Sequence, residues 1–280
     1  MTEIEKVGGI AYQKPTVVLL QQTGVGVSEI AARTCYDSFG SSENGSICSL
    51  GDTLPTEEAL KEINAIDDSK LLDDLAWTYF HHSILEHTNL SYLIKGTSRG
   101  VLQEHARHRI QAISVRSTRY TMSNVINAYV ASLEDRNPRE FFIEKLLELD
   151  MLVTADEVYN RLEIGNIFDK LEYQRTQMED FYAKAVAKSS LVFLDEFRAQ
   201  SEALFEALQN GKKKRNVGDL FKHIVTDNWK VDMVVTFNLR SLKNYFSLRD
   251  SGAAYFQIRW LAREMKAVTP QKYLKLIVKE

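Results

Sequence analysis

The sequence predicts a protein of mixed α/β class, because short stretches typical of strands stand beside longer stretches typical of helices. Residues 16–20 (TVVLL) are rich in β-branched residues and leucine, and residues 89–95 alternate apolar with more polar side chains, so both favour strands. Apolar residues recur at helical spacing over residues 56–80 and 139–210. Residues 232–249 lack Gly and Pro, and we expect one long helix there. A hydrophobic content of 44% over 280 residues is enough for one substantial core.

The composition indicates one domain without an extended linker. The chain has four prolines and few glycine clusters. We therefore expect a single domain over residues 1–280, in which residues 139–215 form a helical elaboration. The formal net charge is −3, from 35 basic and 38 acidic residues, so the molecule as a whole offers no field that attracts polyanions. A nucleic-acid partner would need a local basic patch.

Cysteine usage and the N-terminus favour a cytoplasmic protein. Cys35 and Cys48 are the only cysteines, and they form neither a CxxC pair nor a metal-ligand spacing. Reduced thiols in a cytosol fit this usage better than a secreted disulfide scaffold. The acidic, polar N-terminus does not resemble a signal peptide, and no apolar run is long enough to span a bilayer.

The first predicted strand leads into a glycine-containing turn. Gly24 and Gly26 follow the strand, and Ser28 is expected to act as the N-cap of a helix through Arg33. The segment matches half of a dinucleotide-binding fingerprint, but it lacks the third glycine and a suitably placed acid. We therefore interpret it as an ordinary strand-to-helix turn.

Two further segments lie on either side of the second predicted strand. Residues 39–51 are rich in Ser, Gly and Asn and are predicted to form a loop. After the strand, Thr97 or Ser98 is expected to cap a helix whose C-terminal end carries Glu104 and Arg107. The arginine-rich chain that follows is expected to be irregular or extended.

Residues 107–120 (RHRIQAISVRSTRY) form the most informative segment of the chain. Four arginines and one histidine stand there without an acid, and hydroxyl side chains lie between the charges. Guanidinium groups suit phosphate oxygens because they are planar, permanently charged and able to form two parallel hydrogen bonds. A solvated surface run paired with acids elsewhere is the alternative, although interleaved apolar residues indicate a half-buried segment. The segment is therefore a candidate anion-binding site.

Three blocks of the sequence resemble flavin-dependent thymidylate synthases (ThyX). Residues 107–109 (RHR), followed after seven residues by Ser117, resemble the RHR-x7-S motif of that family. Residues 31–37 (AARTCYD) resemble its N-terminal helix block, and residues 237–249 (FNLRSLKNYFSLR) resemble its C-terminal block. His81 and the Glu-His pair five residues later fall where the family has its His and Glu-His.

The resemblance implies a fold and a reaction. The fold would be a twisted, largely antiparallel sheet packed with long helices, with an enlarged helical middle region. The reaction would be the reductive methylation of dUMP to dTMP, with methylene-tetrahydrofolate as carbon donor, FAD as hydride carrier and NADPH as reductant. The resemblance also implies a homotetramer with shared active sites. We expect neither nucleic acid nor a membrane as a partner.

The resemblance also assigns residues by position. The residues implied at the chemistry are Arg249, Ser117 and His81. Flavin contacts are implied for Cys35, Ser83, Glu86, Arg107, His108, Arg109, Ile110, Ser114, Asn238, Arg240, Asn244 and Leu248. Nucleotide contacts are implied for Glu104, Arg107, Val115, Arg116, Ser117, Thr118, Arg119, Lys222 and Arg249. A fixed positive charge from Arg249 beside a carbonyl of the uracil would make the ring carbon a better nucleophile.

Several positions depart from the pattern usual in the family. Glu104 stands in place of a Gln, and we expect its charge to be paired, with Arg116 as the candidate partner. Lys222 keeps the charge of the usual Arg but loses the bidentate fork. The remaining departures are Cys35, Ser114, Val115 and Ala253.

Two alternative functions stay open, and a possible metal site needs to be weighed beside them. The chain could be a degenerate relative that binds nucleotide or flavin without synthase activity. It could also be an RNA- or DNA-binding module built on the arginine loop, although no aromatic platform is evident beside that loop. Residues 81–87 (HHSILEH) could suggest a metal site, but no HExxH pattern is present and no cysteine lies nearby, so we expect no metal.

Overall fold

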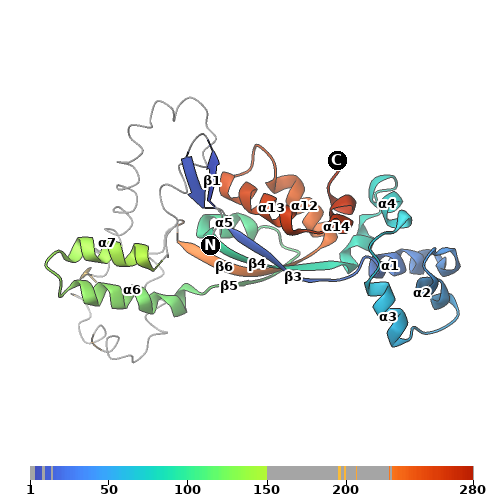
Figure 1. Cartoon of the computed structure of the whole chain (residues 1–280), viewed down its shortest axis with the longest axis horizontal. Helices are drawn as coiled ribbons and strands as arrows, with labels where there is room; N and C mark the ends of the chain where they lie inside the picture. Colours follow the sequence, from blue (N-terminus) through green and yellow to red (C-terminus); the bar gives the residue numbers. More distant parts are fainter. Residues whose placement is uncertain are drawn as a thin grey trace. The chain divides into compact units, whose positions relative to one another are not determined.

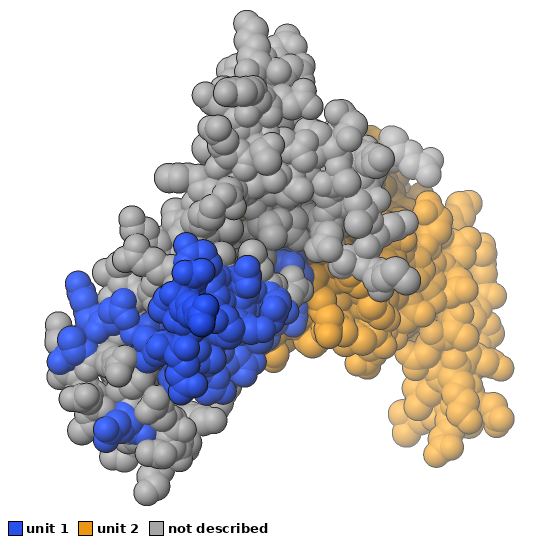
Figure 2. Space-filling model, turned by 60° about the vertical axis from the view of Figure 1, so that its left-hand side comes forward, with its two compact units in different colours: residues 1–14, 96–103, 115–232 blue, residues 15–95, 104–114, 233–280 orange. Residues whose placement is uncertain are grey.

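The structure of the chain is a computed structural model that describes residues 4–7, 10–13, 15–149, 195, 196, 199, 206, 227 and 229–279. The chain divides into two compact units that interleave along the sequence (Figure 2). The first unit comprises residues 1–14, 96–103 and 115–232, and the second unit comprises residues 15–95, 104–114 and 233–280. The single domain expected over residues 1–280 stays a prediction.

The main sheet has four strands in the order β3-β4-β6-β5. Their bounds are Thr16–Gln22 for β3, Asn89–Ser98 for β4, Ala112–Val115 for β5 and Lys230–Asn238 for β6. β3 and β4 are antiparallel, with Thr16 opposite Lys95, so both strands predicted in this part of the chain are confirmed. β1 (Ile4–Val7) and β2 (Ile10–Gln13) form a separate antiparallel pair.

Helices make up most of the remaining described structure. Those of the second unit with seven or more residues are α1 (Gly26–Tyr36), α3 (Glu57–Asn64), α4 (Lys70–Trp77), α12 (Leu239–Arg249), α13 (Phe256–Val268) and α14 (Gln271–Ile277). Its short helical turns are η1 (Phe39–Ser41), α2 (Gly45–Cys48), η2 (Ser49–Gly51) and η3 (His82–His87). α5 (Arg99–His105) follows β4, and the first unit adds α6 (Thr118–Ser132) and α7 (Pro138–Glu148). The mixed α/β class is confirmed.

The core of the second unit lies between the sheet and one layer of helices. In Figure 1, α12, α13 and α14 lie together on one side of the sheet. The strand side chains of the second unit that are buried include Val17, Leu90, Tyr92, Ile94, Met233, Val235 and Phe237. They alternate with more exposed neighbours, which is the period of a strand with one covered face. The other face leaves Val18, Leu20 and Val234 exposed.

The single long helix expected over residues 232–249 is wrong. β6 continues to Asn238, and α12 begins only at Leu239. The first half of the stretch is rich in β-branched residues that pack well on a pleated surface, and the absence of Gly and Pro does not distinguish a strand from a helix. Asn238 marks the change, because its side-chain oxygen accepts the backbone N–H of Ser241 at 2.8 Å and so caps α12.

α1 begins earlier than predicted, and Ser28 is not its N-cap. The helix starts at Gly26, and Ser28 is buried in its first turn with its hydroxyl oxygen 2.7 Å from the Thr88 hydroxyl oxygen. The glycines permit close packing: a Cβ on Gly24 would lie 2.2 Å from the carbonyl oxygen of Asn64, and one on Gly26 would also meet the end of α3. This packing agrees with an ordinary strand-to-helix turn.

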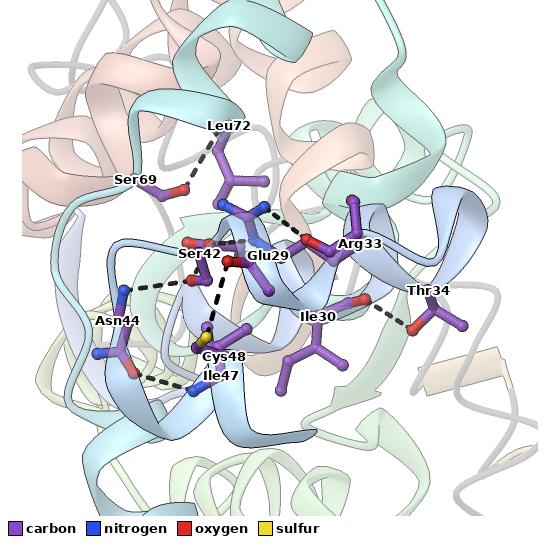
Figure 3. A network of polar contacts seen from close by, with 12 residues as sticks. Glu29, Ile30, Arg33, Thr34, Ser42, Asn44, Ile47, Cys48, Ser69 and Leu72 are labelled. Atoms are coloured by element: carbon purple, nitrogen blue, oxygen red, sulfur yellow. Dashed lines mark hydrogen bonds and ion pairs between the residues drawn. The ribbon is translucent and has the colours of Figure 1, made fainter. Parts of the chain in front are cut away.

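The loop predicted over residues 39–51 contains short helical turns instead, and a buried carboxylate anchors them (Figure 3). Glu29 accepts hydrogen bonds from Arg33 Nε and from Ser42 Oγ, both at 2.7 Å. Burial raises the pKa of Glu29, but hydrogen bonds, led by one from Ser69, outweigh burial and leave the pKa below its usual value. Because Ser69 is the N-cap of α4, this network ties α1 to the turns and to α4.

The other helix predictions are met in part. The stretch over residues 56–80 contains two helices, α3 and α4, which Thr56 and Ser69 cap. Ser98 caps α5 as expected, because its hydroxyl accepts a backbone N–H of the first turn at 3.3 Å. α7 begins the helical region expected from residue 139, and most of that region lies outside the described residues.

Candidate functional site

An open cavity in the second unit gathers residues of the arginine-rich segment and of α12. Its volume is about 1130 Å³. No Asp or Glu is among its described lining residues, and the cationic side chains that line it are Arg107, Arg109, Arg240, Lys243 and Arg249. Such a cavity favours a ligand that carries several negative charges.

Two segments of the chain supply most of this lining. On α12, Lys243 and Asn244 lie three and four residues after Arg240, and both therefore neighbour Arg240 on the helix surface. Leu248 continues that surface, and residues 107–110 lie on the irregular chain between α5 and β5. The structure thus brings together seven of the twelve residues for which flavin contacts are implied: Arg107, His108, Arg109, Ile110, Arg240, Asn244 and Leu248.

Arg249 is held at all three of its guanidinium nitrogens. Nη1 donates to Glu104 Oε2 at 2.7 Å, Nη2 donates to the main-chain oxygen of Glu104 at 3.1 Å, and Nε donates to His108 Nε2 at 2.8 Å. The expected pairing of Glu104 with Arg116 is wrong, because the Glu104 carboxylate faces Arg249 and, at 3.8 Å, Arg107. The side chain of Arg249 is 15% exposed, so its guanidinium is fixed before any ligand binds.

Two buried histidines, His108 in the cavity lining and His105 beside Tyr245, are neutral near pH 7. Burial, and then the charge of Arg249, lower the pKa of His108 to about 4, which agrees with His108 accepting a hydrogen bond through an unprotonated Nε2. Burial likewise lowers the pKa of His105 to about 4, and its Nδ1 lies 3.1 Å from the Tyr245 hydroxyl. Both rings pack edge-on against Tyr245. Neither histidine therefore adds a positive charge for a ligand.

Lys243 and His82 line the cavity although the sequence assigned them no role. Lys243 Nζ lies 3.6 Å from the ring centroid of Trp77 and 3.2 Å from His82 Nε2, and burial lowers its pKa. The signal that could have identified Lys243 is its spacing, three residues after Arg240 on one helix face. Arg240 itself pairs with Glu86, another predicted flavin contact.

A second cavity, of about 370 Å³, adjoins the first, because Arg240 and His82 line both. Cys35, His81 and Ser83 also line it, so predicted site residues from two segments of the chain meet there. Exposed aromatic side chains complete part of the wall, which suits a planar ring.

The ligand contacts predicted in β5 and just after it are not among the described residues that line the two cavities. Ser114, for which a flavin contact is implied, is exposed in β5. The first unit contains Val115, Arg116, Ser117, Thr118 and Arg119. There Arg116 donates to Asp232 Oδ2 at 3.3 Å and to the main-chain oxygen of Lys230 at 2.7 Å. Lys222 lies outside the described residues, and the ligand roles of all these residues stay predictions.

The residues that suggested a metal site have other partners. His82 Nε2 lies 3.0 Å from the main-chain oxygen of Ala76, and Glu86 pairs with Arg240. Within the described ranges, no group of three or more His, Cys, Asp or Glu side chains is arranged to hold a metal ion.

The fold and the site together define a class of protein. An α/β chain that lines one open cavity with five cations, and that joins this cavity to a smaller one with aromatic walls, is suited to large anionic ligands with ring systems. Nucleotides and nucleotide-containing cofactors have this chemistry.

Comparison with known proteins identifies the family within this class. Residues 18–272 match the family model "Thymidylate synthase complementing protein" (Thy1), and the chain therefore belongs to this family. The resemblance to flavin-dependent thymidylate synthases is confirmed.

Relatives of similar length carry that name. The flavin-dependent thymidylate synthase of Wolinella succinogenes is 26% identical over 258 residues, which cover 92% of this chain and 95% of the relative. That of Campylobacter jejuni (strain RM1221) is 28% identical over 260 residues, which cover 92% and 93%. A crystal structure of thymidylate synthase X from Helicobacter pylori with FAD and dUMP is 26% identical, with a TM-score of 0.56 and coverage of 94% of this chain and 97% of that one.

Proposed function

We propose that the chain catalyses the reductive methylation of dUMP to dTMP with FAD bound in the cation-lined cavity. The observation that carries the proposal is the grouping of five cationic side chains around one cavity whose described lining holds no acid. FAD brings a diphosphate and dUMP a monophosphate, and several converging cations are needed to hold both. The Helicobacter pylori relative has been crystallised with these two ligands.

The residues of the cavity fit FAD. Arg107, Arg109 and Arg240 offer cations to the diphosphate. Ile110 and Leu248 are 68% and 52% exposed, and such apolar surface beside polar groups suits a flavin ring. When bound, FAD supplies the hydride transfer, which no protein side chain can perform.

Arg249 is the residue that we propose for the chemical step on dUMP. Its guanidinium would lie beside a carbonyl of the uracil, where a fixed positive charge stabilises an electron-rich ring. Glu104 and His108 keep the guanidinium in place, and the lowered pKa of His108 leaves its ring neutral near pH 7. Ser117 and Arg119, from the motif, are proposed for the nucleotide phosphate.

The co-substrates complete the balance of the reaction. Methylene-tetrahydrofolate supplies the carbon, NADPH supplies the reducing equivalents, and dUMP exchanges a ring hydrogen for the methyl group. We propose the second cavity for a planar ring, because His81 and aromatic side chains line it. His81 would stack there, and Cys35 and Ser83 would border the ligand.

We further propose that the active protein is a cytoplasmic homotetramer with shared active sites. The sheet face that exposes Val18, Leu20 and Val234 supports self-association, because exposed apolar side chains favour a partner surface. As a separate observation, the described part of the chain contains no helix that is both long and apolar enough to cross a membrane.

The visible absorption spectrum of the purified protein tests the cofactor assignment. We expect a flavin spectrum, release of FAD on denaturation, and loss of the chromophore when Arg109 and Arg240 are both replaced by Gln. Replacing the exposed Lys61 by Gln serves as a control outside the cavities, and it should keep the chromophore. A colourless protein that takes up no added FAD, and that binds oligonucleotides in a salt-sensitive way, would favour the nucleic-acid alternative.

A further inference from the structure

Glu104 faces two arginines of the cavity and is hydrogen-bonded to one of them. Its Oε2 accepts a hydrogen bond from Arg249 at 2.7 Å, and its Oε1 lies 3.8 Å from Arg107 Nη1. Its main-chain oxygen adds a further bond to Arg249 at 3.1 Å. One residue at the end of α5 therefore binds a cation on α12 and also faces a cation of the RHR segment, whose side chain is 75% exposed.

The contacts leave part of Arg249 available. A guanidinium carries five N–H bonds, and one on each nitrogen is used by Glu104 and His108. Two N–H bonds remain on a side chain that is 15% exposed and lines the cavity. A ligand would thus meet a donor pair whose orientation is already set, which is the arrangement that stabilises developing charge without reorganisation.

We propose that Glu104 is a positioning residue that orients Arg249 for the reaction by bridging it to Arg107. The proposal rests on the proposed function of Arg249. It also assigns a purpose to a carboxylate beside an anion-binding cavity, where a negative charge weakens the binding of anions.

The contacts around Arg249 differ from those of an ordinary surface ion pair. Exposed pairs contribute little to stability, whereas Arg249 is largely buried and is bound at three nitrogens. A glutamine could replace only half of the bridge, because its amide offers one acceptor oxygen and turns an NH2 group toward the other arginine. The two replacements, Glu104→Gln and Glu104→Ala, therefore remove the bridge in two steps.

Steady-state kinetics of the flavin-loaded protein test the proposal. We expect Glu104→Ala to lower kcat by about 100-fold, since small misplacement of a catalytic group has effects of this size. Glu104→Gln should lower kcat by roughly tenfold, because its amide oxygen can keep the side-chain hydrogen bond to Arg249 that Glu104→Ala removes. The KM for dUMP should stay the same or fall in both variants, because the cavity becomes more positive.

The control is Glu148→Ala, which removes an exposed glutamate of α7 that pairs with Lys145. It should change neither constant. A kcat for Glu104→Ala within twofold of the unaltered protein, or a rise in KM with kcat unchanged, would show that Glu104 does not position Arg249. A merely structural role predicts a different pattern, in which flavin content and thermal stability fall together with kcat.

Crystal structures of the unaltered protein and of Glu104→Ala separate this proposal from the proposed function. If the unaltered protein makes no dTMP, the proposed function fails, but the position of the guanidinium can still be compared. We expect one conformation of Arg249 in the unaltered protein and a displaced or divided guanidinium in the variant. An unmoved Arg249 in Glu104→Ala would overturn the bridging role.

Discussion

At the scale of single residues, Arg249 is the side chain on which the proposed chemistry depends most. It lines the cavity, and Glu104 and His108 fix it. We expect Arg249→Ala to lower kcat by on the order of 10²- to 10³-fold, as happens when one preorganised donor to a developing charge is lost. The kcat of Arg249→Lys should lie between those of the unaltered protein and of Arg249→Ala, because lysine keeps the positive charge but loses the forked pair of donors. Near-normal turnover by a folded, flavin-loaded Arg249→Ala variant would refute this role.

The two neutral histidines make a second residue-scale prediction, on stability. The pKa values of His105 and His108 are lowered from 6.5 to about 4 in the folded chain, so the unfolded chain binds more protons between these values. The free energy of unfolding should therefore fall as the pH drops from about 6.5 toward 4, by on the order of 1 to 2 kcal/mol per histidine at pH 5.

Urea unfolding at pH 7 and pH 5 measures this change. A His108→Asn variant should lose less stability between the two pH values than the unaltered protein, because one of the two groups is gone. Equal stability at pH 7 and pH 5 in the unaltered protein would mean that neither histidine is buried in its neutral form.

Part of the candidate site could be predicted from the sequence, and part could not. Motif spacing indicated the RHR segment and the α12 block, and the structure groups both around one cavity. Lys243 and His82 were missed because the contacts that place them at the cavity join residues far apart in the sequence. Lys243 packs on the Trp77 ring and lies beside His82. The partner of Glu104 was misjudged for the same reason, since its partner Arg249 is 145 residues away.

At the scale of elements, the boundary between β6 and α12 explains where the prediction of the fold succeeded and failed. β3 and β4 were predicted because alternation and turn residues are local signals. β6 was not predicted, because a stretch without Gly or Pro is compatible with both a helix and a strand. The residues that pack against it in the fold decide between the two. The decisive feature is Asn238, which ends the strand and caps the helix.

Asn238 therefore makes an element-scale prediction. Asn238→Ala should lower the free energy of unfolding by about 1 kcal/mol, because the backbone N–H of Ser241 loses its acceptor. Asn124 offers a matched control, since it is exposed within α6, where alanine is a better helix former. Thermal unfolding of both variants tests this prediction. If Asn124→Ala lowered the free energy of unfolding as much as Asn238→Ala, the capping role of Asn238 would be contradicted.

At the scale of the whole molecule, the expected assembly is a homotetramer. The segment after α5 and the residues on α12 already meet within the second unit, so one chain supplies much of the cavity lining. The exposed apolar side chains of the sheet, Val18, Leu20 and Val234, give the physical reason for association. Light scattering should therefore give four times the 32.1 kDa mass of one chain.

A matched pair of variants tests where the chains meet. Val18→Glu together with Leu20→Glu should reduce the mass measured by light scattering, whereas Leu54→Glu, at an exposed position away from the sheet, should not. A monomer that turns over at the full rate would contradict the shared active site.

The release of tritium from dUMP labelled on the ring carbon that receives the methyl group tests the central claim most directly. The flavin-loaded protein should release tritium and form dTMP only when methylene-tetrahydrofolate and NADPH are both present. Flavin-loaded protein that binds dUMP but releases no tritium under these conditions would contradict the proposed function and favour a relative that binds the ligands without synthase activity.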